Sequence, residues 1–121
     1  MTRKMLAVML LVALILIVGI TAYAGTSGIW YNVTVPPLGA VQILSDTKTT
    51  TLDYFCIRLN SGTAESIVGS SNNGGKMKIY KGQGYAKIYY DTVPGLHETV
   101  KLYASLTSAA HQTAEGRSYC N

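Results

Sequence analysis

The segment Lys76-Met77-Lys78-Ile79-Tyr80, followed by Gly82-Gln83-Gly84 and then by Tyr85-Ala86-Lys87-Ile88-Tyr89-Tyr90, decides the fold class of this chain. Apolar and polar residues alternate in both arms, which is the period of a β-strand that buries one face. The two glycines between the arms can supply the positive φ angles of a tight turn. The segment therefore predicts a β-hairpin.

The same pattern continues on both sides of this segment. Tyr54–Leu59 reads as a central strand, Ile29–Val35 alternates up to a pair of prolines, and Thr99–Ser105 alternates again. No window after residue 25 keeps the apolar spacing of an amphipathic helix. Short strands at this spacing predict an all-β domain, a compact antiparallel sandwich or barrel of about 6–8 strands.

The N-terminus has the pattern of an export signal. Arg3 and Lys4 precede an uninterrupted apolar run, Met5–Val18, and Ala22 and Ala24 frame a small-residue cleavage site. We expect a signal-peptide helix at 1–24, removed by cleavage after residue 24, and a single β-rich extracellular domain at 25–121, secreted or associated with the cell surface. A retained anchor is the alternative, but the run is shorter than the roughly 20 residues that a spanning helix needs.

The net charge is +4, and without Arg3 and Lys4 it is +2. So small an excess argues against a nucleic-acid partner and against strong attraction to a membrane surface. We expect membrane contact only through the signal segment before cleavage.

Cys56 and Cys120 are the two cysteines of the chain. An even number in an exported domain predicts a disulfide, which by loop-closure entropy would stabilise the fold by about 4 kcal/mol. The alternative is a reactive thiol with His97 or His111 as its base, but neither cysteine lies in a recognisable motif. The four residues contain no close ligand pair, so we expect no metal site and no cofactor.

Alternation divides the later strands into two faces. The apolar face consists of Met77, Ile79, Ala86, Ile88, Val100, Leu102 and Ala104. The polar face consists of Lys76, Lys78, Tyr80, Tyr85, Lys87, Tyr89, Lys101 and Tyr103. If the strands are neighbours, this Lys/Tyr face can hold an anionic polymer, since lysine supplies charge and tyrosine a flat ring and a hydroxyl. The alternative is the ordinary wet face of an antiparallel sheet.

The other candidate residues give weaker signals. Trp30 can be a core anchor or a platform for a sugar, and we expect the core. The acidic residues are scattered and His97 and His111 fall in loops, so we expect no enzyme. The hypotheses are a secreted non-catalytic binding domain that engages envelope polyanions or an exported protein, an antibacterial or toxin-like factor acting on a membrane, and a small hydrolase.

Four segments resemble small exported proteins of Gram-positive bacteria that have no assigned function. They are Tyr31–Gly39 with its proline turn, Thr47-Lys48-Thr49, Val100–Ala104 and Ala114–Ser118. The resemblance implies an exported β-fold and carries over no functional residue. The chain departs from that group at its end, where Tyr119 and Cys120 stand in place of a tryptophan.

Overall fold

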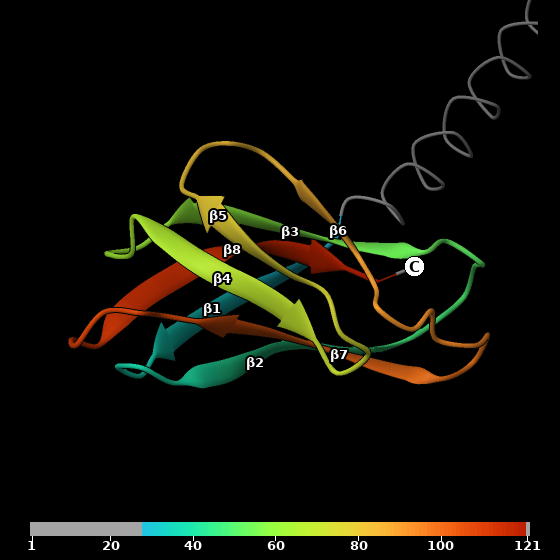
Figure 1. The fold of residues 1–121 in the computed structure, drawn as a ribbon. Coiled ribbons are helices and arrows are strands. Elements are labelled where there is room, and N and C mark those ends of the chain that lie inside the picture. The colour runs from blue at the N-terminus through green and yellow to red at the C-terminus, as the bar shows by residue number, and fades with distance from the viewer. Residues whose placement is uncertain (1–27, 121) are drawn as a thin grey trace, which may run out of the picture.

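The computed structural model describes residues 28–120, which form two antiparallel four-stranded β-sheets (Figure 1). Sheet A has the strand order β1-β8-β3-β6, and sheet B has the order β2-β7-β4-β5. The strands are β1 (Ile29–Val35), β2 (Ala40–Thr47), β3 (Tyr54–Ser61), β4 (Ser66–Ser71), β5 (Lys76–Tyr80), β6 (Ala86–Tyr89), β7 (Thr99–Ser105) and β8 (Gln112–Tyr119). The predicted signal peptide lies outside the described residues.

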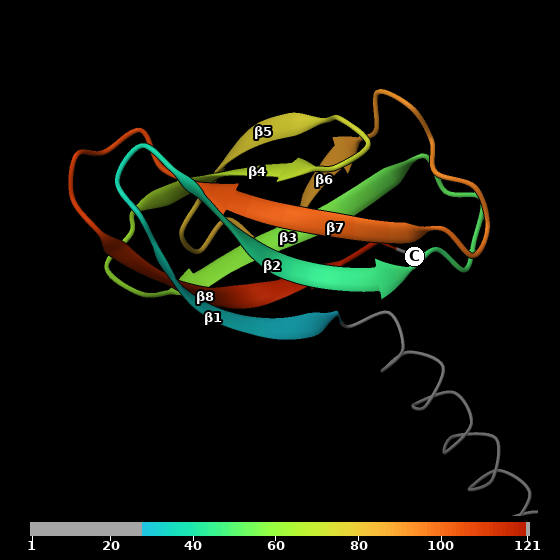
Figure 2. The ribbon, with the colours of Figure 1, turned by 90° about the horizontal axis from the view of Figure 1, so that it is seen from below.

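The strand order is that of a jelly roll. β1 pairs with β8, β2 with β7, β3 with β6 and β4 with β5, so the chain follows one long antiparallel hairpin rolled into two sheets. Figure 2 shows the two layers of strands. The prediction of an all-β antiparallel sandwich is confirmed. In the described residues no helix is both long and apolar enough to cross a membrane.

The core between the sheets is built by the alternation that the sequence shows. In β7, Val100, Leu102 and Ala104 are fully buried while Thr99 and Lys101 are exposed. Phe55 and Ile57 point inward from β3. Burying such apolar surface contributes about 25 cal/mol per Å² and drives the sheets together. Of the predicted apolar face only Met77 is out of place, since it lies 41% exposed on edge strand β5.

The predicted hairpin between β5 and β6 is wrong. β5 pairs with β4 in sheet B, and β6 pairs with β3 in sheet A. Gly82 and Gly84 do adopt positive φ angles, 84° and 89°. Their segment nevertheless carries the chain from one sheet to the other (Figure 1), and the Gly82 N–H donates to the carbonyl of Leu59 at 3.0 Å. Alternation places residues on faces, but it does not say which strands are neighbours.

The predicted disulfide is also wrong: Cys56 and Cys120 are both free and both buried. Cys56 stands opposite Tyr119 in the β3–β8 ladder, so these two side chains share the outer face of sheet A. Cys120 follows Tyr119, and its side chain points the other way, into the core. A disulfide needs Cβ atoms within about 4.5 Å of each other, which two side chains on opposite faces of a sheet do not reach.

We expect purified protein to carry two thiols. Alkylation in denaturant without a reducing agent should add two groups per chain, and native protein should react slowly because Cys56 is 4% and Cys120 is 1% exposed. Intact-mass spectrometry measures both. A chain two hydrogens lighter that takes no alkylating agent would show that the predicted bond forms after all.

Candidate functional site

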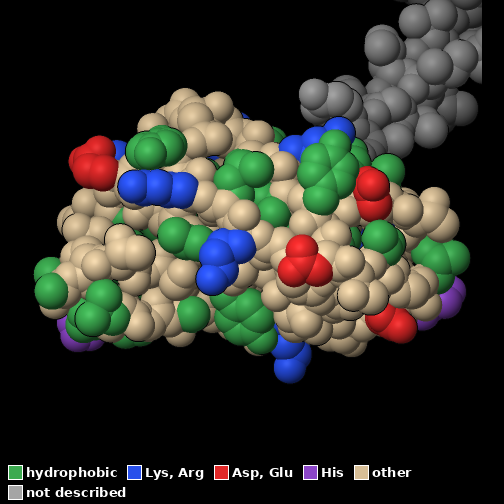
Figure 3. Space-filling model, in the orientation of Figure 1, with side chains coloured by type: hydrophobic (Ala, Val, Ile, Leu, Met, Phe, Trp, Pro, Cys, Tyr) green, Lys and Arg blue, Asp and Glu red, His purple; other side chains and the backbone are tan. Residues whose placement is uncertain are grey.

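The structure divides the predicted Lys/Tyr face between the two sheets. The outer face of sheet B carries Lys76, Lys78, Tyr80, Lys101 and Tyr103. The outer face of sheet A carries Lys87 and Tyr89 from β6, with Tyr85 just before that strand. The division follows from the pairing of β5 with β4 and of β6 with β3. Figure 3 shows the front of Figure 1, where lysine and arginine side chains are scattered among hydrophobic, uncharged and acidic ones.

On the outer face of sheet A, Tyr85, Lys87 and Tyr89 lie beside residues that were not predicted from the sequence to belong to a site. The strand ladders align Trp30 with Arg117, Arg117 with Arg58, and Tyr54 with Tyr89. Side chains directly opposite in a ladder share a face. We call the resulting surface the aromatic–cationic face, and it consists of Trp30, Tyr54, Arg58, Tyr85, Lys87, Tyr89, Arg117 and Tyr119.

Lys87 is the centre of the half formed by β3 and β6. Its Nζ lies 4.1 Å from the ring centroid of Tyr54 and 6.0 Å from that of Tyr89. The two rings meet edge to face with centroids 6.1 Å apart. A cation over an aromatic ring is stabilised by about 0.5–1 kcal/mol at an exposed site. The rings therefore favour a position of the ammonium above the sheet, where it remains exposed.

The other half is formed by β1, β8 and the residue before β6. The Arg117 guanidinium lies 5.9 Å from the Trp30 ring centroid and donates to the Gly28 carbonyl at 3.3 Å. Arg58 lies 5.8 Å from the ring of Tyr85, which meets Tyr119 edge to face at 5.3 Å. Each cation is thus held against a ring and keeps N–H groups for a ligand.

Trp30 corrects a further expectation. The core position at this end of β1 belongs to Tyr31, which is 4% exposed, whereas the Trp30 side chain is 49% exposed. Tyr89, on the opposite edge strand of the sheet, is 56% exposed. The face therefore has an accessible flat ring on each edge strand, and Arg58 and Arg117 lie on the two strands between them.

Glu115 marks one end of this face. It lies on β8 two residues before Arg117, and its carboxylate accepts a hydrogen bond from the Ser61 hydroxyl at 2.9 Å. Since side chains two apart on a strand share a face, this carboxylate sets the limit of positive potential on β8. An anionic ligand would lie on the Arg117 side of it.

Cys56 lies between Lys87 and Tyr119 on the aromatic–cationic face and is buried under its larger side chains. Burial raises the pKa of its thiol, although a hydrogen bond with Tyr119 and the charge of Lys87 act in the opposite direction. A raised pKa leaves little thiolate at neutral pH, which works against the reactive-thiol alternative. His97 and His111 are exposed in loops beyond the two ends of β7. Within residues 28–120 no three His, Cys, Asp or Glu side chains gather closely enough to hold a metal ion.

No family model matches this chain. No curated protein and no solved structure matches it either.

The sequence held part of the information needed to predict this face. In the strand Tyr54–Arg58, alternation sets Tyr54, Cys56 and Arg58 on one side. The sequence does not show that β3 lies between β6 and β8, and this neighbourhood brings Lys87 over Tyr54 and Arg58 beside Arg117. Without knowing the order of the strands in the sheet, the aromatic–cationic face could not be predicted.

Proposed function

We propose that the protein is a secreted, non-catalytic binding domain that holds an anionic polymer of the cell envelope on its aromatic–cationic face. The observation that carries the proposal is the gathering of Arg58, Lys87 and Arg117 on one sheet face, each against an aromatic ring. An exported protein with an acidic surface could use the same face, and it is the alternative partner.

The width of the face suits an extended chain. Trp30 and Tyr89 lie on the outermost strands of sheet A, which are three strand spacings apart, or about 14 Å at roughly 4.8 Å per spacing. A polymer that crosses the strands can place its negative groups against the cations and its apolar surfaces against the exposed rings. Lysine and arginine on exposed sites bind weakly one at a time, so a repeating ligand gains from engaging several.

A membrane-active factor would need a large contiguous apolar surface. The exposed large hydrophobic residues are spread over several elements, with Leu38 in the β1–β2 turn, Met77 on β5, and Val93 and Leu96 in the β6–β7 loop. Single exposed apolar residues of this kind are ordinary on a soluble domain. The arrangement therefore supports the binding domain over the toxin-like alternative.

The test is retention on isolated wall and membrane fractions at low and high salt, with protein purified from an exporting host that expresses the full chain. The triple variant Arg58→Gln, Lys87→Gln, Arg117→Gln should bind about 10- to 100-fold more weakly at low salt, since exposed charge contacts contribute about 0.5–1 kcal/mol each. Its binding should also depend less steeply on salt.

The matched control is Lys76→Gln, Lys78→Gln, Lys101→Gln, which removes the same charge from the outer face of sheet B. This variant should retain most of the binding. Equal loss in both variants would show attraction by net charge without a site, and no retention of the parent protein at either salt would remove the proposal.

A further inference from the structure

A hollow of about 280 Å³ opens on the other sheet, where β4 and β7 part. The pairing of β4 with β7 begins at Val68 and Ser105, so the first residues of β4 have no β7 neighbour. The chain leaves sheet B after Ser105 and continues as β8 in sheet A. The hollow is lined by Glu65, Ser66, Ile67, Val68, Lys78, Ser105, Leu106, Thr107, Ser108 and Gln112.

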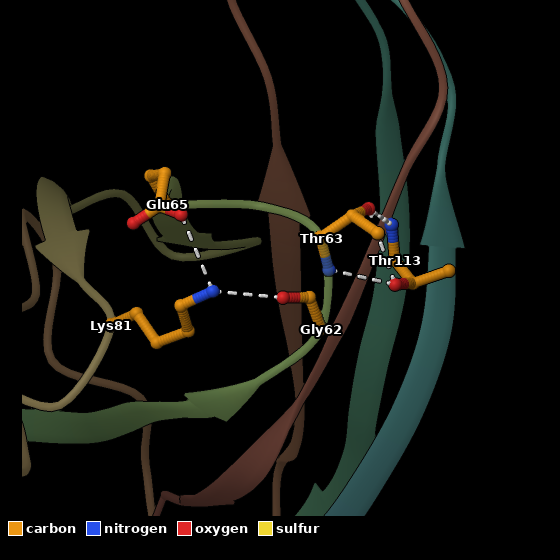
Figure 4. A network of polar contacts seen from close by, with 5 residues as sticks. All are labelled: Gly62, Thr63, Glu65, Lys81 and Thr113. Carbon is orange, nitrogen blue, oxygen red and sulfur yellow. Dashed lines mark hydrogen bonds and ion pairs between the residues drawn. The ribbon is translucent and has the colours of Figure 1, made fainter.

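Two walls of the hollow are fastened by a polar network (Figure 4). The Thr63 N–H donates to Oγ1 of Thr113 at 2.9 Å, and the Thr113 N–H donates to Oγ1 of Thr63 at 2.8 Å. Lys81 Nζ lies 3.5 Å from a carboxylate oxygen of Glu65 and donates to the Gly62 carbonyl at 2.9 Å. The network fixes the β3–β4 loop against the start of β8 and so sets the distance between the two walls, one at Glu65 and one beside Thr113.

The hollow presents polar groups that have no partner within the described part of the chain. The side chains of Ser66, Thr107 and Gln112 line it and make no hydrogen bond to another residue of 28–120. The carbonyl of Val68 accepts a hydrogen bond from the Ser105 hydroxyl at 3.3 Å, so it points toward β7. Backbone groups two residues apart on a strand point the same way, so those of Ser66 face the hollow.

The charge of this site differs from that of the aromatic–cationic face. Glu65 and Lys78 line the hollow with opposite signs, and every other lining side chain is uncharged. Tyr80 stands opposite Ser66 in the β4–β5 ladder, is 55% exposed, and has Lys78 Nζ 5.3 Å from its ring centroid. Hydroxyl and amide groups beside an exposed ring favour a neutral ligand that has hydroxyls on its edge and apolar C–H surface on its face.

We propose that this hollow binds one or two neutral sugar units, as a site separate from the aromatic–cationic face. Its volume of about 280 Å³ is that of about nine water molecules at roughly 30 Å³ each. It is slightly smaller than the roughly 300 Å³ at which the usual range of ligand pockets begins. The apolar floor includes Leu106, which is 7% exposed. The hollow lies on sheet B and the aromatic–cationic face on sheet A, so this proposal does not depend on polymer binding.

The experiment is an amide NMR titration of the folded protein with glucose, galactose, N-acetylglucosamine and their disaccharides, each up to its solubility. At least one sugar should bind saturably with millimolar affinity. The chemical-shift changes that it causes should be confined to the amides around Ser66, Thr107 and Gln112. The double variant Thr107→Val, Gln112→Ala should bind that sugar about tenfold more weakly, because two hydrogen bonds are lost. The control Thr47→Val, exposed at the end of β2 far from Ser105, should leave the affinity unchanged.

Three results would overturn the proposal. They are the absence of saturable shifts with every sugar, equal shifts with glycerol as a general polyol, and sugar shifts located on Trp30 and Tyr89 instead. The melting temperature of each variant distinguishes loss of a contact from loss of the fold. Anionic polymer retention is measured on the same variants and should not change, which separates this site from the proposed polymer face.

Discussion

Replacing Gly116 with alanine should destabilise the protein by about 3–5 kcal/mol. Gly116 lies on β8, the strand between β1 and β3, where the Tyr31 hydroxyl passes over it to donate to the Arg58 carbonyl at 2.7 Å. A Cβ atom at this position would overlap the Arg58 carbonyl oxygen and lie 2.8 Å from the Tyr31 hydroxyl. The backbone of β3 cannot move aside without breaking its ladder, and a displaced tyrosine would remove the hydroxyl that donates to the partly buried Arg58 carbonyl.

Gly69→Ala is the matched control, because Gly69 is also buried in a strand and also lies close to its neighbours. An added Cβ there would meet the terminal methyl carbons of Ile57 at 2.7 Å and Ile79 at 2.8 Å, which are the flexible ends of side chains. We expect a loss of about 1–2 kcal/mol. Urea unfolding at neutral pH measures both variants. If Gly116→Ala proved no more harmful than Gly69→Ala, contact with the β3 backbone would not explain the need for glycine at position 116.

Strand faces could be predicted from the sequence and strand neighbours could not. The alternation in Thr99–Ser105 correctly set Val100, Leu102 and Ala104 inside, because side-chain direction is a local property of an extended chain. The partner of each strand depends on how the whole chain rolls up. The Gly82-Gln83-Gly84 segment has the glycines of a turn, and the same conformations serve equally in a connection between two sheets.

The candidate site was predictable to the same extent. Lys87 and Tyr89 were correctly set on an outer face, but Lys78 and Lys101 belong to the opposite sheet. The prediction of a disulfide was wrong for a related reason. Successive side chains of a strand take opposite faces, and the register of β3 with β8 sets Cys56 opposite Tyr119 and not opposite Cys120. Register is fixed by packing across the sandwich, and an even number of cysteines in an exported chain gives no information about it.

The two proposed sites use different local chemistry on a single scaffold. On sheet A, strand pairing repeatedly sets a cation beside a ring, as with Arg117 and Trp30. On sheet B, the hollow arises where a strand pair ends and Ser66 loses its β7 neighbour. A jelly roll presents both outer faces to solvent, so a charged polymer and a neutral sugar could be held without competing for the same surface.

Alkaline pH should unfold the protein steeply, because two phenols are buried. Burial raises the pKa of Tyr31 well above 10.0, and its hydroxyl donates to a main-chain carbonyl. Burial also raises the pKa of Tyr90, with the charges of Cys120 and Cys56 adding to the effect. In the unfolded chain both phenols release their protons near pH 10, while the folded protein retains them. The folded state then binds more protons, so stability falls as pH rises.

The expected loss is about 1.4 kcal/mol per pH unit for each phenol above pH 10, or about 5 kcal/mol for both by pH 12. The raised thiol pKa values of Cys56 and Cys120, each caused first by burial, start the decline near pH 9. Burial lowers the pKa of Lys48, which acts with the opposite sign but only below its unfolded value of 10.5.

The free energy of unfolding measured in urea between pH 8 and pH 12 tests this slope. Tyr90→Phe is the diagnostic variant, since it keeps the ring, whose centroid lies 5.1 Å from that of Phe55, and removes the proton. Its stability should fall by about 1.4 kcal/mol less per pH unit above pH 10 than that of the parent chain. Parallel curves for the two proteins would mean that the Tyr90 phenol ionises in the folded state, and burial would then not be the source of alkaline unfolding at this position.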